Sequence, residues 1–259
     1  MITVLVSGAA GRMGSEVVRT VLAEPDLELV AAVDPGRAGD PVGEGTSLRY
    51  EPDLAAAIDA TRPQVMVDFT HPSVVAGTIT TALGKGVHCV VGTTGLATDE
   101  LERLAASAKD GACLFMAPNF AIGAVLMMRF AGQAARYMPH VEIIELHHDR
   151  KADAPSGTAL RTASLIAEAR AEAPEAPGRE TEIAEGARGA LVNGVSIHSV
   201  RLPGLVAHEE VLFGGQGQTL SIRHDSIDRT SFMPGVVLAI RSVVGRSGLI
   251  IGLEQFMEE

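Results

Sequence analysis

The sequence predicts an α/β protein: a Rossmann-type doubly wound parallel sheet, followed by a second α/β domain built on a mixed or antiparallel sheet. Short apolar runs alternate with helical patterns through the first 118 residues, which is typical of parallel strands covered on both faces. A glycine-rich turn follows the first of these runs, and the alternation stops near Asn119. The 259 residues are enough for two domains with cores of their own.

The first domain is predicted from strands and helices that alternate along the chain. Apolar and β-branched residues place the strands at 2–6, 28–34, 64–69, 87–91 and 112–116, and helical patterns lie at 12–23, 53–60, 73–85 and 98–109. Right-handed crossovers between parallel strands make such a sheet doubly wound, so ligands should bind where the strands end.

The second domain is predicted at 119–227. A helix at 121–137, a strand at 141–148 and a helix at 156–171 precede a Pro-rich connection at 172–178. Strands at 195–202, 208–213 and 219–224 then follow one another without crossover helices, which indicates a mostly antiparallel sheet. A last helix at 229–244 should return the chain to the first domain, which is therefore expected to comprise 1–118 and 228–259.

Composition narrows the class of partners. The net charge of −11 disfavours nucleic acid, but not a small anion held by a local cluster of cations. Cys89 and Cys113 lie in apolar runs without metal-ligand spacing, as expected of buried free thiols in a reducing compartment. The sequence enters a strand directly, without a signal-peptide pattern, and no apolar run reaches the roughly 18–20 residues that span a bilayer. We therefore expect a cytoplasmic protein with no membrane partner and no metal.

The turn at 8–14, with the spacing Gly-x-x-Gly-x-x-Gly, is the candidate dinucleotide site. Glycines let the backbone turn tightly and approach a pyrophosphate, and the following helix offers free N–H groups. An ordinary strand–helix turn has similar residues, but the position at the start of the alternating pattern favours a cofactor. Asp34 could accept hydrogen bonds from the adenine ribose, or it could simply begin a turn at Pro35. An acid there favours NADH, whereas Arg12 and Arg37 keep NADPH open.

Two further turns follow apolar strands and should lie along the same edge of the sheet. They are Gly92-Thr93-Thr94-Gly95 and Ala117-Pro118-Asn119-Phe120, and small residues there can line a nicotinamide pocket. The similar turn Phe69-Thr70-His71-Pro72 is a lesser candidate for contact with the cofactor.

The polar run at 142–159 is the candidate chemical site. It places His147, His148 and Lys151 just before a Ser156-Gly157-Thr158 turn at a helix start. Imidazole exchanges protons near neutral pH, lysine supplies a cation, and hydroxyls with helix N-terminal N–H groups can hold a carboxylate. A metal held by the two histidines is disfavoured, because adjacent strand residues point to opposite faces. A solvated loop in which Ser156 or Thr158 merely caps the helix stays open on the residues alone.

The string His-His-x-x-Lys-x-Asp-Ala-Pro-Ser-Gly-Thr-Ala at 147–159 closely resembles the signature of the dihydrodipicolinate reductase family, also described as 4-hydroxy-tetrahydrodipicolinate reductase. The turns at 8–14, 92–95 and 118–120 recur in order at matching distances, so the resemblance covers essentially the whole chain. It implies reduction of (2S,4S)-4-hydroxy-2,3,4,5-tetrahydrodipicolinate, a cyclic dicarboxylate, to 2,3,4,5-tetrahydrodipicolinate by NADH or NADPH with loss of water, in diaminopimelate and lysine biosynthesis. It also implies a homotetramer assembled by the second domain.

The resemblance implies a role for each matching residue. His147 and Lys151 would be the catalytic proton handlers, and the substrate-binding residues would be His148, Ser156, Gly157 and Thr158. Cofactor contacts are implied at Gly8, Ala9, Ala10, Gly11, Arg12, Met13, Asp34, Gly92, Thr93, Thr94, Ala117, Pro118, Asn119 and Phe120. Some members carry an arginine directly after the acidic residue, where this chain has Pro35, so the preference between NADH and NADPH stays open.

Three other functions would require different residues from those found in this sequence or a different position for them. A non-catalytic nicotinamide-sensing module would keep the glycine-rich turn but would not need the histidines and Lys151. Another two-domain NAD(P)-dependent reductase would not be expected to carry the Ala-Pro-Ser-Gly-Thr run. A catalytic thiol of the aldehyde-dehydrogenase kind at Cys89 is disfavoured by its place inside an apolar strand.

Overall fold

The structure, a computed structural model, describes residues 1–174 and 181–257, so most of the Pro-rich connection expected at 172–178 lies outside the described residues. The chain divides into two compact units. The first comprises Met1–Phe120 and Phe232–Glu259, and the second is Ala121–Ser231. These boundaries lie within a few residues of the expected ones. No helix of the described residues is long and apolar enough to cross a membrane.

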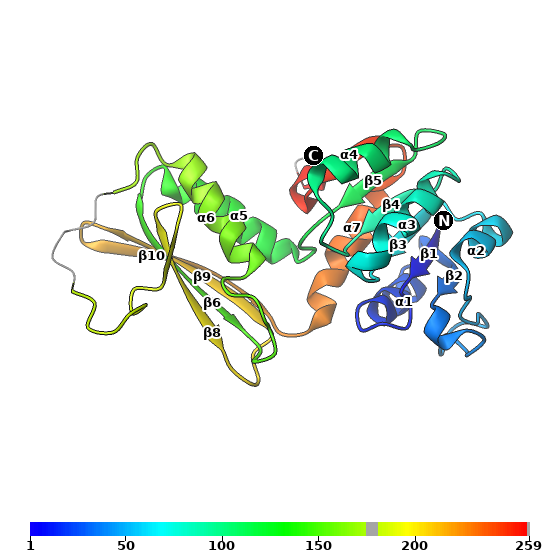
Figure 1. Cartoon of the computed structure of the whole chain (residues 1–259), viewed down its shortest axis with the longest axis horizontal. Coiled ribbons are helices and arrows are strands. Elements are labelled where there is room, and N and C mark those ends of the chain that lie inside the picture. Colours follow the sequence, from blue (N-terminus) through cyan, green and yellow to red (C-terminus); the bar gives the residue numbers. More distant parts are fainter. Residues whose placement is uncertain (175–180, 258–259) are drawn as a thin grey trace. The chain divides into compact units, whose positions relative to one another are not determined.

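The first unit is built on six parallel strands (Figure 1). Their order is β11-β5-β4-β3-β1-β2, and they are β1 (Ile2–Ser7), β2 (Leu27–Val33), β3 (Val65–Asp68), β4 (His88–Val91), β5 (Cys113–Met116) and β11 (Gly248–Ile251). The predicted doubly wound sheet is confirmed. Because β1 lies between β2 and β3, the winding reverses there, and ligands of such sheets bind at the carboxyl ends of the strands at this point.

Helices cover both faces of this sheet (Figure 1). The helices α1 (Gly14–Ala23) and α7 (Met233–Val243) pack together on one face, and α2 (Leu54–Thr61), α3 (Pro72–Leu83) and α4 (Thr98–Ala106) lie in sequence along the other. Short 3₁₀ helices lie between or after the longer elements. They are η1 (Pro35–Arg37), η2 (Arg229–Phe232) and η3 (Leu253–Phe256). The returning helix was predicted, whereas β11 was not.

Both cysteines lie in the core of this sheet as free thiols. Burial raises the pKa of the Cys113 thiol to about 11 and raises that of Cys89 as well. A thiol must ionise to act as a nucleophile. Neither cysteine is therefore suited to covalent catalysis.

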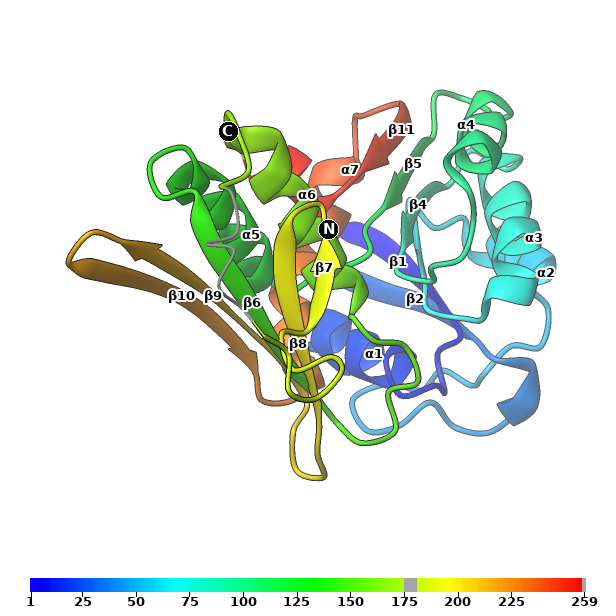
Figure 2. The same cartoon turned by 60° about the vertical axis from the view of Figure 1, so that its left-hand side comes forward.

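The second unit is a five-stranded mixed sheet with two helices on one face (Figure 2). The order is β10-β9-β6-β8-β7, and the strands are β6 (His140–His147), β7 (Ala190–Val192), β8 (Val195–Arg201), β9 (Ala207–Gly215) and β10 (Gln218–Ser226). The helices α5 (Ile122–Ala135) and α6 (Gly157–Ala169) pack against each other and against this sheet.

Two features of this sheet depart from the expected antiparallel sequence of strands. Strand β8 runs parallel to β6, because α6 lies in the connection between them and carries the chain back across the sheet. Strand β7 was missed, although Asn193 and Gly194, both with positive φ, form the hairpin turn that joins β7 to β8. An Asn-Gly pair is the sequence signal for such a hairpin.

Candidate active site

The glycine-rich turn occupies the carboxyl end of β1, where its backbone is too crowded for side chains. Gly8 has φ +74°, and a Cβ at Gly14 would lie 2.0 Å from the Gly8 carbonyl oxygen. No side chain caps α1, which begins at Gly14, although the Ser15 N–H already donates to the Gly11 carbonyl at 2.9 Å. A close backbone approach and an uncapped helix N-terminus are the features that a pyrophosphate requires.

Asp34 fixes this turn from the end of β2. Its Oδ2 accepts a hydrogen bond of 3.0 Å from the Ala10 N–H, and its Oδ1 accepts one of 3.1 Å from the Gly36 N–H. The carboxylate therefore begins the turn at Pro35, as one sequence interpretation held. Each carboxylate oxygen has a second lone pair, so Asp34 keeps acceptor capacity for a ribose hydroxyl.

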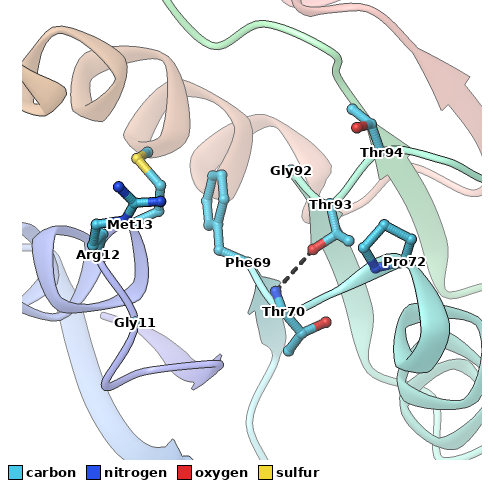
Figure 3. Close-up of a pocket in the computed structure, with 9 residues that line it drawn as sticks. All are labelled: Gly11, Arg12, Met13, Phe69, Thr70, Pro72, Gly92, Thr93 and Thr94. Carbon is cyan, nitrogen blue, oxygen red and sulfur yellow. Dashed lines mark hydrogen bonds between the residues drawn. The ribbon is translucent and has the colours of Figure 1, made fainter. Parts of the chain in front are cut away.

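A pocket of about 360 Å³ opens beside the turn (Figure 3). Its lining includes six predicted cofactor residues, namely Gly11, Arg12, Met13, Gly92, Thr93 and Thr94. It also includes Phe69, Thr70 and Pro72, from the turn that was a lesser candidate. A Cβ at Gly92 would lie 2.0 Å from the Phe69 ring, so this glycine is what lets the aromatic ring stand beside the pocket.

The remaining predicted cofactor residues lie around this pocket rather than in its lining. The Gly8 and Ala9 N–H groups both donate to the Val33 carbonyl, at 3.0 and 3.1 Å, and so tie the turn to β2. The loop Ala117-Pro118-Asn119-Phe120 follows β5, and the buried Phe120 ring packs on Phe69 with ring centres 5.7 Å apart. These residues support the pocket wall.

A buried carboxylate that the sequence analysis did not single out lies beneath the pocket. Asp68, at the end of β3, is fully buried and accepts hydrogen bonds from the Thr93 hydroxyl at 2.7 Å and the Thr70 hydroxyl at 2.9 Å. Burial raises the pKa of Asp68, and these neutral donors offset only part of that effect. Because Thr93 Oγ1 also lies 2.8 Å from the Thr70 N–H (Figure 3), the carboxyl group joins two pocket-lining turns.

The second unit gathers its polar groups on the sheet face that α6 covers. Residues opposite one another across the strands share a face, and one such row contains Ser199, Glu145, Glu209 and His224, from β8, β6, β9 and β10. The next row contains Arg201 and His147. The preceding row is apolar, since Ile197, Ile143 and Val211 are buried there.

Glu145 is the centre of this cluster. Its side chain is 0% exposed, and its two oxygens each accept a 2.8 Å hydrogen bond from the Arg201 guanidinium. Nδ1 of His147 lies 2.5 Å from Glu145 Oε2, and the Ser156 N–H donates to Oε1 at 3.2 Å. Burial would raise the pKa of Glu145, but hydrogen bonds from His147, Arg201 and a serine hydroxyl outweigh it and lower the pKa to about 2.

Arg201 extends this cluster to the other predicted proton handler. Its second terminal nitrogen, besides contacting Glu145, donates to the Asp153 carbonyl at 2.7 Å. The Asp153 carboxylate in turn holds the Lys151 ammonium, with both oxygens 2.8 Å from Nζ. His147 and Lys151 are therefore tied to one network through Glu145, Arg201 and Asp153.

The predicted carboxylate clamp forms the start of α6. Ser156 is buried, and its Oγ accepts a hydrogen bond of 3.2 Å from the Ala159 N–H, so it caps the helix. The cap uses a lone pair and leaves the hydroxyl proton for another acceptor. Gly157 and Thr158 follow in the first turn. Nδ1 of His148 is buried and has no hydrogen-bond partner within the described ranges 1–174 and 181–257.

Comparisons with known proteins agree along the whole chain. The profile described as dihydrodipicolinate reductase, N-terminus, matches residues 2–120, and the one described as dihydrodipicolinate reductase, C-terminus, matches residues 123–257. The chain belongs to the dihydrodipicolinate reductase family. The chain is 51% identical over 266 residues to the 4-hydroxy-tetrahydrodipicolinate reductase of Desulfitobacterium hafniense, with 99% of each chain covered.

Further relatives within the dihydrodipicolinate reductase family match the chain in sequence and in structure. The 4-hydroxy-tetrahydrodipicolinate reductase of Mycolicibacterium smegmatis is 52% identical over 255 residues, covering 98% of each chain. The dipicolinate-bound dihydrodipicolinate reductase of Paenisporosarcina sp. TG-14 superposes with a TM-score of 0.88 at 45% identity, covering 98% of this chain and 99% of that one.

Family membership fixes the reaction. The chain is an oxidoreductase that uses NADH or NADPH to reduce 4-hydroxy-tetrahydrodipicolinate to tetrahydrodipicolinate, with loss of water, in lysine and diaminopimelate biosynthesis. The Rossmann unit of the dihydrodipicolinate reductase family is the cofactor-binding one, which agrees with the glycine-rich turn and the pocket beside it. The sensing module and the unrelated two-domain reductase are thereby excluded.

Proposed function

We propose that His147 and Lys151 supply the proton that this reduction requires, and that α6 and His148 hold the substrate. The observation that carries the proposal is the single network that runs from His147 through Glu145, Arg201 and Asp153 to Lys151. Reduced nicotinamide supplies a hydride, so each turnover also consumes one proton. A proton donor must therefore stand beside the substrate as negative charge develops on it.

Glu145 decides which ring nitrogen of His147 meets the substrate. An ionised carboxylate can only accept hydrogen bonds, so Nδ1 of His147 carries the hydrogen in their 2.5 Å contact. This leaves Nε2 as the nitrogen that exchanges a proton with the substrate.

Lys151 contributes a positive charge that Asp153 holds in place. Its ammonium is mostly buried, and both Asp153 oxygens accept from it at 2.8 Å. An ammonium held at one position can donate a proton to the developing anion or stabilise its charge. We assign His147 and Lys151 jointly to proton handling.

The start of α6 binds one substrate carboxylate in this proposal. The N–H groups of Gly157 and Thr158 lie in the first helical turn, where the helix dipole favours a bound anion, and the Ser156 hydroxyl lies beside them. His148 orients the substrate. The Paenisporosarcina relative binds dipicolinate, which carries two carboxylates like the substrate, and this supports a site made of anion-binding groups.

In the first unit, we propose that the cofactor pyrophosphate lies on the turn at 8–14 and that Asp34 contacts the adenine ribose. The support is the crowded glycine backbone and the pocket lined by Arg12, Thr93 and Thr94. Gly8, Ala9 and Ala10 shape the turn, and the loop Ala117-Pro118-Asn119-Phe120 forms the wall toward the nicotinamide. Both NADH and NADPH fit this arrangement, since Arg12 can neutralise an added phosphate.

Stopped-flow reduction tests the assignment of Lys151. Lys151→Ala should lower kcat about 10²–10³-fold, as loss of a general acid does, with little change in KM, whereas Thr158→Ala should act mainly on KM. Lys109→Ala, which removes an exposed lysine of the first unit, is the control and should behave as wild type. An unchanged kcat for Lys151→Ala would remove Lys151 from proton handling.

We also propose that the enzyme is a cytoplasmic homotetramer assembled through the second unit. Within that unit, the sheet face opposite α5 and α6 carries the apolar side chains of Ile144, Leu146 and Leu212. Self-association would cover them. Light scattering should give four times the chain mass, and Leu212→Glu should lower it; a monomer in the wild type would contradict the proposal.

A further inference from the structure

Glu209, on β9, is a second acidic residue of the cluster around Glu145. The proposed function gives Glu209 no role. It lies directly opposite Glu145 on the neighbouring strand, on the same sheet face, and is 4% exposed. Its Oε1 contacts Thr162 of α6, one turn beyond Thr158. Two adjacent buried carboxyl groups cannot both ionise without a large electrostatic cost. Glu145 is the ionised member, because Arg201 binds it through both oxygens.

The hydroxyl group of Thr162 indicates where the proton of Glu209 lies. Thr162 Oγ1 is 3.0 Å from the Thr158 carbonyl oxygen and 2.5 Å from Glu209 Oε1. A hydroxyl has one proton to donate, and a carbonyl oxygen can only accept. Both contacts are hydrogen bonds only if Thr162 donates to Thr158 and Glu209 donates to Thr162. This requires a protonated carboxyl group.

The burial of Glu209 and its neighbouring charges also favour the protonated form of its carboxyl group. Its Oε2 is buried and has no partner among the described residues, and an unpaired buried charge is costly. Burial raises the pKa of Glu209, to about 7, and the negative charge of Glu145 contributes to that shift.

Neighbouring elements supply few charges that could compensate an ionised Glu209. Strand β6 presents Glu145 and His147, and β10 presents His224, whose own pKa burial lowers. The charged residues of α6, Arg161 and Glu168, pair with each other at 3.6 Å on its exposed side. Helix α5 carries a single charged residue, Arg129.

We propose that Glu209 is a positioning residue that must be protonated for tight binding of the dicarboxylate, because its proton lets Thr162 hold the first turn of α6 in place. This rests on the proposed function, in which α6 binds a substrate carboxylate. When Glu209 ionises, the Thr162 hydroxyl turns to it and releases the Thr158 carbonyl. The negative charge of ionised Glu209 then also lies near the N-terminal end of α6, where the substrate carboxylate is proposed to bind. Repulsion between the two anions weakens binding further.

The test is the pH dependence of dicarboxylate binding by the enzyme saturated with reduced cofactor. The probe is dipicolinate, whose carboxyl groups are both ionised above pH 6, so its own charge does not change. The wild-type Kd, measured by titration calorimetry, should rise about ten-fold between pH 6 and pH 8.5. In Glu209→Gln, which keeps a donor for Thr162 and cannot ionise, the rise should be absent or much smaller.

Two variants make the result interpretable. Glu210→Gln removes a neighbouring carboxylate on the opposite sheet face, which contacts Ser221 and Arg223, and should keep the wild-type rise. Thr158→Ala tests the proposed function itself. If Thr158→Ala binds dipicolinate as wild type does at pH 6, the α6 clamp is wrong; if Thr158→Ala is weakened but Glu209→Gln keeps the full pH dependence, only the role of Glu209 is wrong.

Infrared spectroscopy of the wild-type enzyme and of Asp68→Asn, which removes the other buried carboxyl group with a raised pKa, tests the proton of Glu209 directly, even if Glu209→Gln folds poorly. A buried protonated carboxyl group gives a C=O stretch separate from the carboxylate bands, and this band should be present at pH 6 and disappear by pH 9. Absence of any such titrating band in the wild type or in Asp68→Asn would overturn the inference.

Discussion

Asp68 in the first unit and Glu145 in the second are equally buried carboxyl groups with opposite pKa shifts. Both side chains are 0% exposed. Asp68 receives hydrogen bonds from the neutral hydroxyls of Thr70 and Thr93, and its pKa is raised by burial. Glu145 is also penalised by burial, but the guanidinium of Arg201 and the imidazole of His147 lower its pKa to about 2. The charged partners of Glu145 therefore account for the opposite direction of its pKa shift.

In the proposed function, this difference suits the ligand assigned to each unit. A dinucleotide brings its own negative charge and would be held by backbone N–H groups, and the carboxyl group beneath the pocket receives hydrogen bonds from neutral donors. The substrate is a dianion that must also receive a proton. A fixed anion at Glu145 keeps Arg201 and His147 oriented within a protein of net charge −11. Each of the following experiments tests one side of this contrast.

Removing the charge of Glu145 should have the largest effect. Glu145→Gln leaves Arg201 without its counterion, and breaking a buried pair costs about 3–5 kcal/mol of unfolding free energy. It also frees the His147 ring to turn, so kcat should fall at least about 10²-fold. Urea unfolding and steady-state kinetics measure both. In the wild type, this stabilisation is present above about pH 4.5 and is lost as the pH falls toward about 2, because the folded-state pKa is the lower one.

Glu142→Gln is the matched control for that variant. Glu142 lies on the same strand but on the opposite face, where His198 and Arg188 bind it and water is accessible. An exposed pair contributes little, about 0–1 kcal/mol. Equal losses of unfolding free energy in Glu145→Gln and Glu142→Gln would show that the buried pair of Glu145 stabilises the fold no more than an exposed pair does. This would contradict the contrast drawn between Glu145 and Asp68.

The sequence indicated two units and most of the residues that the proposed function assigns to ligand binding, because these depend on local patterns. The glycine-rich turn, the strand before it and the helix start at Ser156 all follow from spacing within a few residues. Glu145 could also have been predicted from the sequence. Ile143, Glu145 and His147 are two residues apart along one strand, so their side chains share a face of the sheet.

The partners of Glu145 could not be predicted in this way. Arg201 is 56 residues further along the chain, and it reaches Glu145 only because β8 lies parallel to β6. The sequence suggested a mostly antiparallel sheet, in which the register of these strands would differ. Glu209 requires the register of β9 as well. Burial and pairing across strands are tertiary properties, which no single pattern in the sequence carries.

Glu209 should give the second largest effect, seen as a pH dependence of stability. Its pKa is raised to about 7 in the folded state from 4.5, so the wild type loses stability as the pH rises through this interval. The full shift corresponds to about 3 kcal/mol. Glu209→Gln removes this loss, so its melting temperature relative to wild type should be several degrees higher at pH 8 than at pH 5. A difference that is constant with pH would contradict a protonated Glu209.

Asp68→Asn should be milder than Glu145→Gln, because no charged partner is left behind. An amide keeps one acceptor oxygen for the Thr93 and Thr70 hydroxyls, so we expect a loss of about 1–2 kcal/mol of unfolding free energy. Because these threonines line the pocket, the KM for the cofactor should rise while kcat stays nearly constant. A loss as large as that of Glu145→Gln would mean that Asp68 is held as an anion.

Asp34→Ala should have the smallest effect and tests the cofactor side with an accessible carboxylate. Its oxygens already accept from the Ala10 and Gly36 N–H groups, so the variant loosens the turn for both cofactors. A contact with the adenine ribose would add a loss for NADH alone, because the 2′-phosphate of NADPH is repelled by the same carboxylate. We therefore expect the Kd for NADH to rise about ten-fold and that for NADPH to rise less, as measured by fluorescence titration. Equal increases would show that Asp34 shapes the turn without contacting the ribose.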